Sequence, residues 1–322
     1  MCNRNAQPKG PSYLITTSLQ RDCFIPAGIG CGARRTPTST VENLHPKALV
    51  IPLHEEVYNR QRMTLPEPKA SLQHLFNRLS PAYARFVFSR LHAETRAHVA
   101  WLQPRASERV LDLACGPGTL ALELARYSCC VYALDLAEGM IAEAQVAARQ
   151  QCSRAIHFAV ADAEQLPLPG GEFDLVTCAF SFPVFPTASK ALHEICRVTC
   201  PRGRIAVLEV VAPEDAAQRA AWDHLERLRS GGIPARLLSL ADLLGLFRRA
   251  GLTLADAHVC ERRRRLEDWL CGAVVEGGPS ARRQLRQEFL ESARGHSSGF
   301  HLERHRGHWF YCAKVARLLW QK

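Results

Sequence analysis

The stretch VLDLACGPGTLALELA, residues 110–125, decides how this chain of 322 residues folds. Its apolar start reaches Asp112, two glycines follow at Gly116 and Gly118, and a helical pattern begins directly after them. A strand, a tight turn and a helix N-terminus in this order commonly bind a nucleotide, because the first N–H groups of the helix have no partner within it. We therefore expect a nucleotide at this turn.

Short apolar runs alternate with helical patterns along the chain. Strands are predicted at 109–114, 130–136, 155–162, 175–182 and 205–211, and helices between them at 119–127, 137–150 and 187–199. One or two amphipathic helices, interrupted near Pro81, are predicted at 72–102. Beyond Pro213 we expect helices at 214–230, 239–252 and 279–293 and strands at 253–264 and 308–320. This alternation predicts an α/β fold whose parallel sheet is covered on both faces.

Domain boundaries follow from a change in composition. Residues 1–68 are largely rich in Gly, Pro, Ser and Thr and lack sustained periodicity, so we expect a disordered or irregular extension. We predict one domain at 69–322, with an insert at about 213–238.

Composition limits the class of protein. The chain is 47% hydrophobic and 22% charged, and no uncharged apolar run approaches the length of a membrane-spanning helix. The 13 cysteines are scattered without a CxxC pair or a recognisable signal peptide, which is typical of a reduced, cytoplasmic protein. His301, His305 and His308 lack a companion Cys or carboxylate motif, so we predict no metal site.

The formal net charge is +10, and it includes the run Arg262 to Arg265. The simplest interpretation of such a run is a solvated cationic face. An anionic substrate, a nucleic acid or a membrane surface remains an alternative.

Three aspartates indicate which nucleotide binds. Asp112, Asp135 and Asp162 end three successive predicted strands, so they meet along one edge of the sheet. A carboxylate at Asp112 suits a ligand with an ammonium group, as in S-adenosylmethionine (SAM), and Asp135 suits ribose hydroxyls. Asp162 suits an adenine amino group, with the N–H of Ala163 beside it. GPGTLA and Asp135 also fit an NAD(P)-dependent oxidoreductase, which we keep as the alternative.

The region from about 72 to 318 resembles the class I SAM-dependent methyltransferases, and more closely the ubiquinone/menaquinone-biosynthesis group (methyltransferase type 11). The motifs that carry the resemblance are VLDLACGPG, VYALDLAEGM, ADAEQLPLPGGEFDLV, EICRVTCPRGRIAVLEV and HWFYCAKVAR. The resemblance implies a Rossmann-like, seven-stranded, mostly parallel sheet with an antiparallel terminal strand, an N-terminal helical lid, and SAM as cofactor. It assigns cofactor binding to Asp112, Ala114, Gly116, Gly118, Asp135, Leu136, Met140, Asp162, Ala163 and Phe180.

The predicted reaction is methyl transfer from SAM to a small, apolar or aromatic acceptor; SAM binding without catalysis remains open. The segment Ala179 to Val184 keeps only the phenylalanine of the S-F-G-L-R-N motif of the quinone-modifying branch, which argues against a quinol. No N/D-P-P-Y run follows the fourth strand, so we expect no nucleic-acid substrate. Tyr83, Glu209 and His224 are the candidate catalytic residues, and the sequence does not indicate the oligomeric state.

Overall fold

The computed structural model describes residues 65–128, 130–153, 156–231, 236–271, 278–295 and 298–322. Its strands are β1 (Arg109–Leu113), β2 (Cys130–Asp135), β3 (Ile156–Val160), β4 (Phe173–Ala179), β5 (Thr199–Val211), β6 (Thr253–Arg265), β7 (Leu302–His305) and β8 (His308–Gln321). Its helices are α2 (Lys69–Arg90), α3 (His92–Leu102), α4 (Thr119–Leu124), α5 (Glu138–Gln150), α6 (Ala188–Val198), α7 (Ala216–Arg229), α8 (Leu240–Arg249), α9 (Leu266–Cys271) and α10 (Gly278–Arg294). The predicted extension at 1–68 lies outside the described residues except for its last four.

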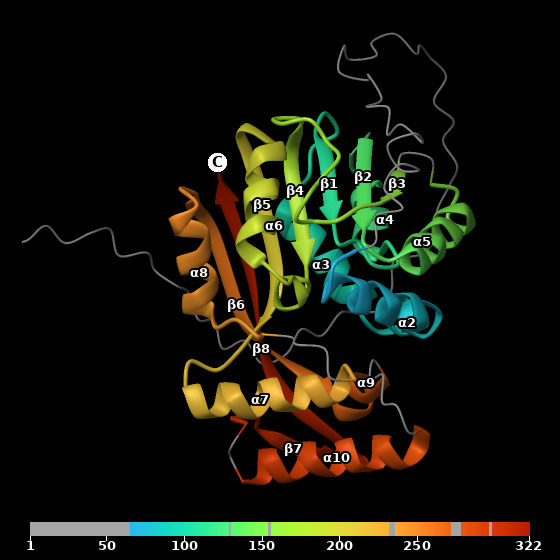
Figure 1. The fold of residues 1–322 in the computed structure, drawn as a ribbon, viewed down its shortest axis with the longest axis vertical. Coiled ribbons are helices and arrows are strands. Elements are labelled where there is room, and N and C mark those ends of the chain that lie inside the picture. Colours follow the sequence, from blue (N-terminus) through green and yellow to red (C-terminus); the bar gives the residue numbers. More distant parts are fainter. Residues whose placement is uncertain (1–64, 129, 154–155, 232–235, 272–277, 296–297) are drawn as a thin grey trace, which may run out of the picture.

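One mixed sheet organises the described chain in the order β3-β2-β1-β4-β5-β8-β6, and β7 pairs with β8 beside this path. Strands β1 to β5 are parallel, whereas β8 runs antiparallel to both β5 and β6. In Figure 1 the parallel strands point down towards α2 and α3, and β8 points upward. The mostly parallel sheet and the antiparallel terminal strand are thus confirmed.

The sheet has an eighth strand where seven were predicted. β7 forms a hairpin with β8 in which His305 faces His308, across a turn that contains Gly307 at a φ of 79°. Because β7 is four residues long and largely exposed, it contains no apolar run from which the sequence could predict it.

Helices cover both faces of the sheet, as the alternation of the sequence predicted. Leu111 and Leu113 point to one face and pack with residues of α6 and α8, whereas Val110 points to the other face and packs with residues of α3, α4 and α5. All three side chains are at most 1% exposed. This burial on both faces explains why the strands read as continuous apolar runs.

A second apolar cluster lies beyond the carboxyl ends of the parallel strands. It joins α7, α9 and α10 to β7 and to the adjoining part of β8, with Trp222, Phe289, Phe300 and Tyr311 at its centre. Figure 1 shows α7 and α10 below the sheet, where β7 and β8 reach them. Of these helices, α7 falls in the predicted insert at 213–238.

The helix α2 continues through Pro81, which corrects the predicted interruption there. Proline lacks the N–H that would bind the carbonyl oxygen of Asn77 in the preceding turn. The hydroxyl of Ser80 donates to that oxygen instead, at 3.0 Å. The break between α2 and α3 comes at Leu91.

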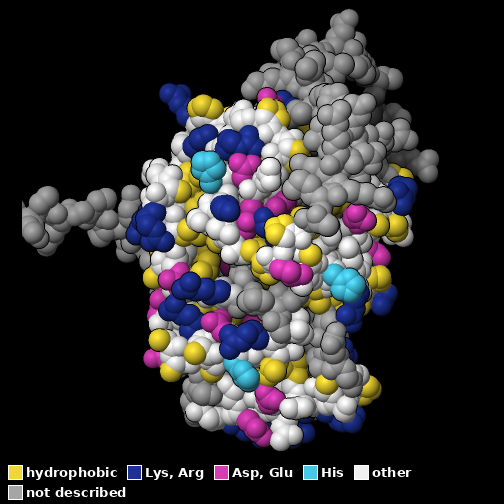
Figure 2. Space-filling model, viewed as in Figure 1, with side chains coloured by type: hydrophobic (Ala, Val, Ile, Leu, Met, Phe, Trp, Pro, Cys, Tyr) yellow, Lys and Arg dark blue, Asp and Glu magenta, His cyan; other side chains and the backbone are white. Residues whose placement is uncertain are grey.

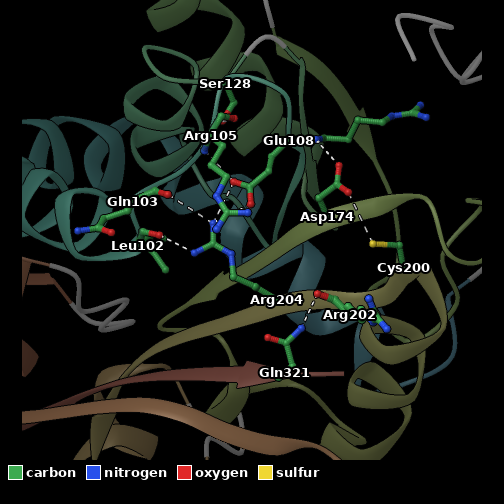
Figure 3. A network of polar contacts seen from close by, with 11 residues as sticks. Leu102, Gln103, Arg105, Glu108, Ser128, Asp174, Cys200, Arg202, Arg204 and Gln321 are labelled. Atoms are coloured by element: carbon green, nitrogen blue, oxygen red, sulfur yellow. Dashed lines mark hydrogen bonds and ion pairs between the residues drawn. The ribbon is translucent and has the colours of Figure 1, made fainter. Parts of the chain in front are cut away.

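Polar side chains connect the amino ends of the strands, opposite the edge where the three aspartates lie (Figure 3). The guanidinium of Arg204 donates to both carboxylate oxygens of Glu108, at 2.9 Å each, and to the carbonyl oxygen of Leu102 at 2.7 Å. Asp174 accepts the backbone N–H of Arg109 at 2.9 Å. β5 already begins at Thr199, earlier than the strand predicted at 205–211, and Arg202 within it has a φ of 65°.

The helices of the described residues include none that is long and apolar enough to cross a membrane.

Candidate functional site

A cavity opens at the carboxyl ends of the parallel strands, beneath α2. Its volume is about 1160 Å³, including the part that is open to solvent. The predicted cofactor residues on its wall are Asp112, Ala114, Gly116, Asp135, Leu136, Met140, Asp162, Ala163 and Phe180. The structure therefore brings together residues from the ends of four strands and from α5. A space of this size suits a cofactor together with a small substrate.

The glycine turn forms the floor of this cavity. Gly116 has a φ of 55°, and a Cβ atom built there would meet only Cε1 of Tyr83, at 3.9 Å. A ligand can therefore approach the backbone closely at Gly116. This is the geometry that a ligand held against backbone N–H groups requires.

Gly118 lies beneath the turn and is not among the described residues that line the cavity. A Cβ atom at Gly118 would come within 2.9 Å of the Cβ atom of Ala144 on α5. The φ of 82° at Gly118 also belongs to the left-handed region. This glycine thus permits close packing of α4 against α5, and its role at the site is indirect.

Asp112 is a buried carboxyl group with one unused oxygen. Its Oδ1 atom accepts the hydroxyl of Thr177 at 3.0 Å, whereas Oδ2 has no hydrogen-bond partner among the described residues. Burial raises the pKa of Asp112 to about 7, against the opposing effect of the Thr177 hydroxyl and the Ala121 amide. A cationic group of a ligand would satisfy this oxygen and favour the ionised form.

Asp135 organises the turn as well as facing the cavity. Its Oδ2 atom accepts the N–H of Gly116 at 2.8 Å, and Oδ1 accepts the N–H of Ala137 at 2.9 Å. Burial raises the pKa of Asp135, while these backbone amides oppose the rise. Each carboxylate oxygen retains a second lone pair for a hydroxyl of a bound ligand.

Asp162 is held by a lysine that the sequence analysis missed. The ammonium group of Lys69 lies 2.6 Å from Oδ2 of Asp162 and 2.8 Å from Oε2 of Glu164. Oδ1 of Asp162 accepts the backbone N–H of Glu164 at 2.9 Å. Lys69 lies only at the amino end of the predicted lid, so no local pattern marks it as part of the site.

Two further polar contacts hold α2 over the cavity. The amide of Gln73 donates to the carbonyl oxygen of Leu136 at 2.9 Å, and Oδ1 of Asn77 accepts the N–H of Gly139 at 2.8 Å. Together with Lys69, these residues connect one face of α2 to the ends of β2 and β3 and to the start of α5. The helix therefore forms the roof of the cavity.

Aromatic side chains face the cavity from above and from β4. Tyr83 of α2 and Phe180 after β4 both line it, and Phe180 adopts a φ of 57°. Burial raises the pKa of Tyr83, and Arg229 and Arg264 oppose this rise. Tyr83 therefore keeps its proton at neutral pH and can donate a hydrogen bond into the cavity.

Glu209 and His224 lie behind or away from this wall. Glu209 is 2% exposed, and its carboxylate oxygens accept the N–H groups of Phe182 and Val210 at 3.3 and 3.0 Å. Burial raises its pKa to about 8, so it is largely uncharged at neutral pH. The imidazole of His224 on α7 is exposed and lies 3.4 Å from Glu288 on α10. Neither residue is part of the cavity lining.

These features fit SAM. The unused oxygen of Asp112 suits its ammonium group, the glycine floor admits its methionine part, and Asp135 and Asp162 stand at successive strand ends where ribose and adenine would lie. The fit rests on two observations. Oδ2 of Asp112 is buried without a partner among the described residues. A Cβ atom at Gly116 would occupy the space above the turn.

The chain is similar to known methyltransferases. Residues 110–203 match the family described as "Methyltransferase domain". The chain is 29% identical to the uncharacterized methyltransferase YcgJ of Bacillus subtilis over 180 residues. This alignment covers 56% of this chain and 69% of that protein. It is 43% identical over 117 residues to a demethylmenaquinone methyltransferase of Thermus thermophilus, with 35% of this chain and 52% of that protein covered. The match thus spans about half of the latter protein.

Solved structures show the same fold. The crystal structure of YcgJ from Bacillus subtilis superimposes with a TM-score of 0.64 at 24% identity, covering 72% of this chain and 98% of that one. A putative methyltransferase from Bacillus halodurans gives a TM-score of 0.64 at 22% identity, covering 71% and 99%.

Proposed function

We propose that this chain, whose residues 110–203 match a methyltransferase domain, is a class I SAM-dependent methyltransferase and transfers the methyl group of SAM to a small acceptor with an apolar or aromatic body. The observation that carries the proposal is the meeting of Asp112, Asp135 and Asp162 on one cavity, around the glycine turn and beneath Tyr83. An oxidoreductase would share the turn and Asp135, and it would have no use for an unpartnered carboxyl at Asp112.

Each aspartate has a distinct binding role in this proposal. Asp112 pairs with the ammonium group of the methionine part through its free oxygen. Asp135, already fixed by two backbone N–H groups, accepts the ribose hydroxyls. Asp162, oriented by Lys69 and by the amide of Glu164, accepts the adenine amino group.

Bound SAM supplies an electrophilic methyl group, which a lone pair of the acceptor takes up while the electrons of the broken C–S bond remain on sulfur. The protein contributes orientation and the exclusion of water. Tyr83 and Phe180 enclose the cavity from the lid and from the sheet, and α2 is held over it by its three polar contacts. Among the described residues, closure over the cofactor therefore comes from α2 and from Phe180.

The acceptor part of the proposal rests on the apolar wall. The apolar side chains that line the cavity include Leu72, Phe76, Val87, Leu91, Val184 and Phe185. Such a wall favours an apolar or aromatic body and offers few groups to a polar sugar or to a nucleic acid. The polar end of the quinone-branch motif is absent from Ala179 to Val184, so we do not extend the proposal to a quinol.

A calorimetric titration of the full chain tests the cofactor part. SAM and S-adenosylhomocysteine (SAH) should bind, and NADH run in parallel should not. The matched variant Asp112→Asn should weaken SAH binding, because the neutral amide cannot pair with an ammonium group. Binding of NADH alone would overturn the proposal.

Methyl transfer itself is measured with SAM labelled in the methyl group, against small aromatic and apolar acceptors. Label in a small molecule supports the proposal. SAM binding without transfer to any acceptor would leave a binding protein without catalysis.

A further inference from the structure

The arginine run of the sequence divides between the two sides of β6. Arg263 is exposed on one side, 2.9 Å from Glu303, with its guanidinium 3.9 Å from the ring centroid of Phe310. Arg264, the next residue, points to the other side, because successive side chains of a strand alternate. Its guanidinium carbon lies 5.8 Å from the ring centroid of Phe180, which lines the cavity. The run is therefore not one solvated cationic face.

Arg264 lacks a full set of partners. Its Nε and Nη2 atoms are buried and make no hydrogen bond within the described part of the chain. The carboxylate nearest to it is that of Glu94, 3.5 Å away, which is longer than a charge-assisted hydrogen bond. Oε1 of Glu94 is itself buried without a partner. Two buried guanidinium nitrogens left in this state cost stability unless another group pairs with them.

The charge of Arg264 acts at the roof of the cavity. Both Arg264 and Arg229 oppose the rise in the pKa of Tyr83. Arg229 is committed to Glu226, at 2.6 Å, and its charge is offset there. Glu209, with a pKa of about 8, contributes little negative charge at neutral pH. Of the charged groups around Tyr83, Arg264 is thus the cation whose pairing is incomplete.

We propose that Arg264 binds a carboxylate of the acceptor, which makes the substrates small organic acids with an apolar or aromatic body. This inference rests on the proposed methyl transfer and narrows its substrate class. The planar guanidinium matches a carboxylate through two parallel N–H donors, and the Tyr83 hydroxyl, which retains its proton, adds a third donor from the lid. Phe180, which lines the cavity 5.8 Å from the Arg264 guanidinium carbon, offers an apolar surface for the rest of the acceptor.

A polyanion on the outer surface is a weaker explanation of the positive charge. On the face shown in Figure 2, Lys and Arg side chains lie in small groups separated by acidic and apolar ones. Arg264 differs from such groups because its guanidinium carbon lies 5.8 Å from the ring of Phe180, which lines the cavity. The number of charges available there suits one carboxylate better than a nucleic acid, which needs many phosphate contacts.

The test uses the full chain with methyl-labelled SAM and a small-molecule extract of the organism that makes the protein. Ion exchange divides the extract into anionic, neutral and cationic fractions. We expect label to enter acceptors of the anionic fraction. The variant Arg264→Gln should lower kcat/KM on these acceptors about tenfold or more, mainly through KM, because a charge-assisted pair is lost.

Arg263→Gln is the matched control, since it removes the same charge from the neighbouring residue on the other side of β6, and it should keep kcat/KM. Arg264→Lys should recover part of the loss, because it restores the charge without the planar fork. SAH affinity, measured on all variants, should stay unchanged.

Label confined to the neutral or cationic fraction, or an unaffected Arg264→Gln variant, would overturn the carboxylate inference and leave methyl transfer standing. SAH binding with no label in any fraction would overturn the transferase proposal, and this inference with it.

Discussion

The ammonium group of Lys69 lies 2.6 Å from the carboxylate of Asp162, although 93 residues separate them in the chain. The same group lies 2.8 Å from Glu164, so one lysine at the start of α2 meets two acids at the end of β3. Its side chain is 14% exposed, which shields these pairs from solvent more than most surface salt bridges. This contact attaches the roof of the cavity to the end of β3, where we propose that adenine binds.

Replacing Lys69 should loosen the start of the lid. In Lys69→Met, α2 loses the ion pairs of its first turn, while Gln73 and Asn77 still hold the next two turns. We expect faster hydrogen exchange in the first turns of α2 and little change in the strands. Lys190→Met, at an exposed position of α6, is the control. Equal exchange in both variants would show that the ion pairs do not hold the lid.

Two glycines with nearly the same φ allow the cost of backbone strain to be measured separately from the cost of a steric clash. Gly118 and Gly251 have φ values of 82° and 81°, but only a Cβ atom at Gly118 meets another side chain, Ala144, at 2.9 Å. Gly251→Ala should lower the free energy of unfolding by ~1 kcal/mol, the cost of the left-handed conformation. Gly118→Ala should cost a further ~1–3 kcal/mol from overpacking. Urea denaturation measures both, and equal losses would contradict the collision.

The ribose and adenine roles predict different losses of affinity. Asp135→Ala should weaken SAH binding ~100-fold, because it removes the ribose acceptor and the anchor of the Gly116 N–H. Asp162→Ala should weaken it less, ~10-fold, because other contacts to adenine remain. Asp174→Asn, at the opposite edge of the sheet, is the control and should bind normally. Near-normal calorimetric affinity of Asp135→Ala would remove its ribose role.

The pKa of Asp112 predicts how SAH binding depends on pH. The pKa is raised to about 7 in the free protein, and an ammonium group beside the carboxylate would lower it. Binding below about pH 7 must therefore release a proton, and affinity should fall up to ~10-fold per pH unit as the pH decreases. Calorimetry in two buffers of different ionisation enthalpy counts that proton. Asp112→Asn should show a smaller pH dependence; an unchanged one would place the ammonium group elsewhere.

The raised pKa of Glu209 predicts that the stability of the protein falls as the pH rises. Its pKa is about 8 in the folded protein and 4.5 ordinarily, so the native state binds the proton more tightly than the unfolded state does. The contribution to stability is complete below about pH 4.5 and is lost as the pH rises towards about pH 8. In Glu209→Gln the slope of the free energy of unfolding should be shallower by up to ~1.4 kcal/mol per pH unit. Parallel slopes by urea denaturation would contradict burial of a neutral Glu209.

The central strands of the sheet could be predicted because they are buried on both faces. Val110 and Leu111 pack on opposite sides of β1, and this double burial produces the apolar runs that the alternation detected. β7 escaped prediction because an exposed four-residue strand depends on its partner β8 and not on its own composition. The helix through Pro81 escaped it because the compensating hydroxyl of Ser80 is a local hydrogen bond that apolar periodicity does not reveal.

The cofactor residues could be predicted for a similar reason. Parallel strands end at one edge, so three aspartates at the ends of successive strands are neighbours whatever the rest of the chain does. Gly118 is the exception among the predicted residues, because its tight contact is with Ala144 of the next helix. Lys69 was missed because only the docking of α2 brings its side chain to Asp162.

The sequence alone determined the α/β class, the order of the elements in the sheet region and the edge at which the predicted cofactor residues gather. These features could be predicted because local apolar runs mark the buried strands and the points where they end. The tertiary structure decided which side chains complete the site. Lys69 and Tyr83 reach it from α2, and Arg264 of β6 lies 5.8 Å from the ring of Phe180, which also lines the cavity. All three positions depend on how separate elements pack. The neighbours Arg263 and Arg264 show this most directly. They are identical residues that point to opposite sides of β6, and the packing of other elements places Phe310 beside Arg263 and Phe180 beside Arg264.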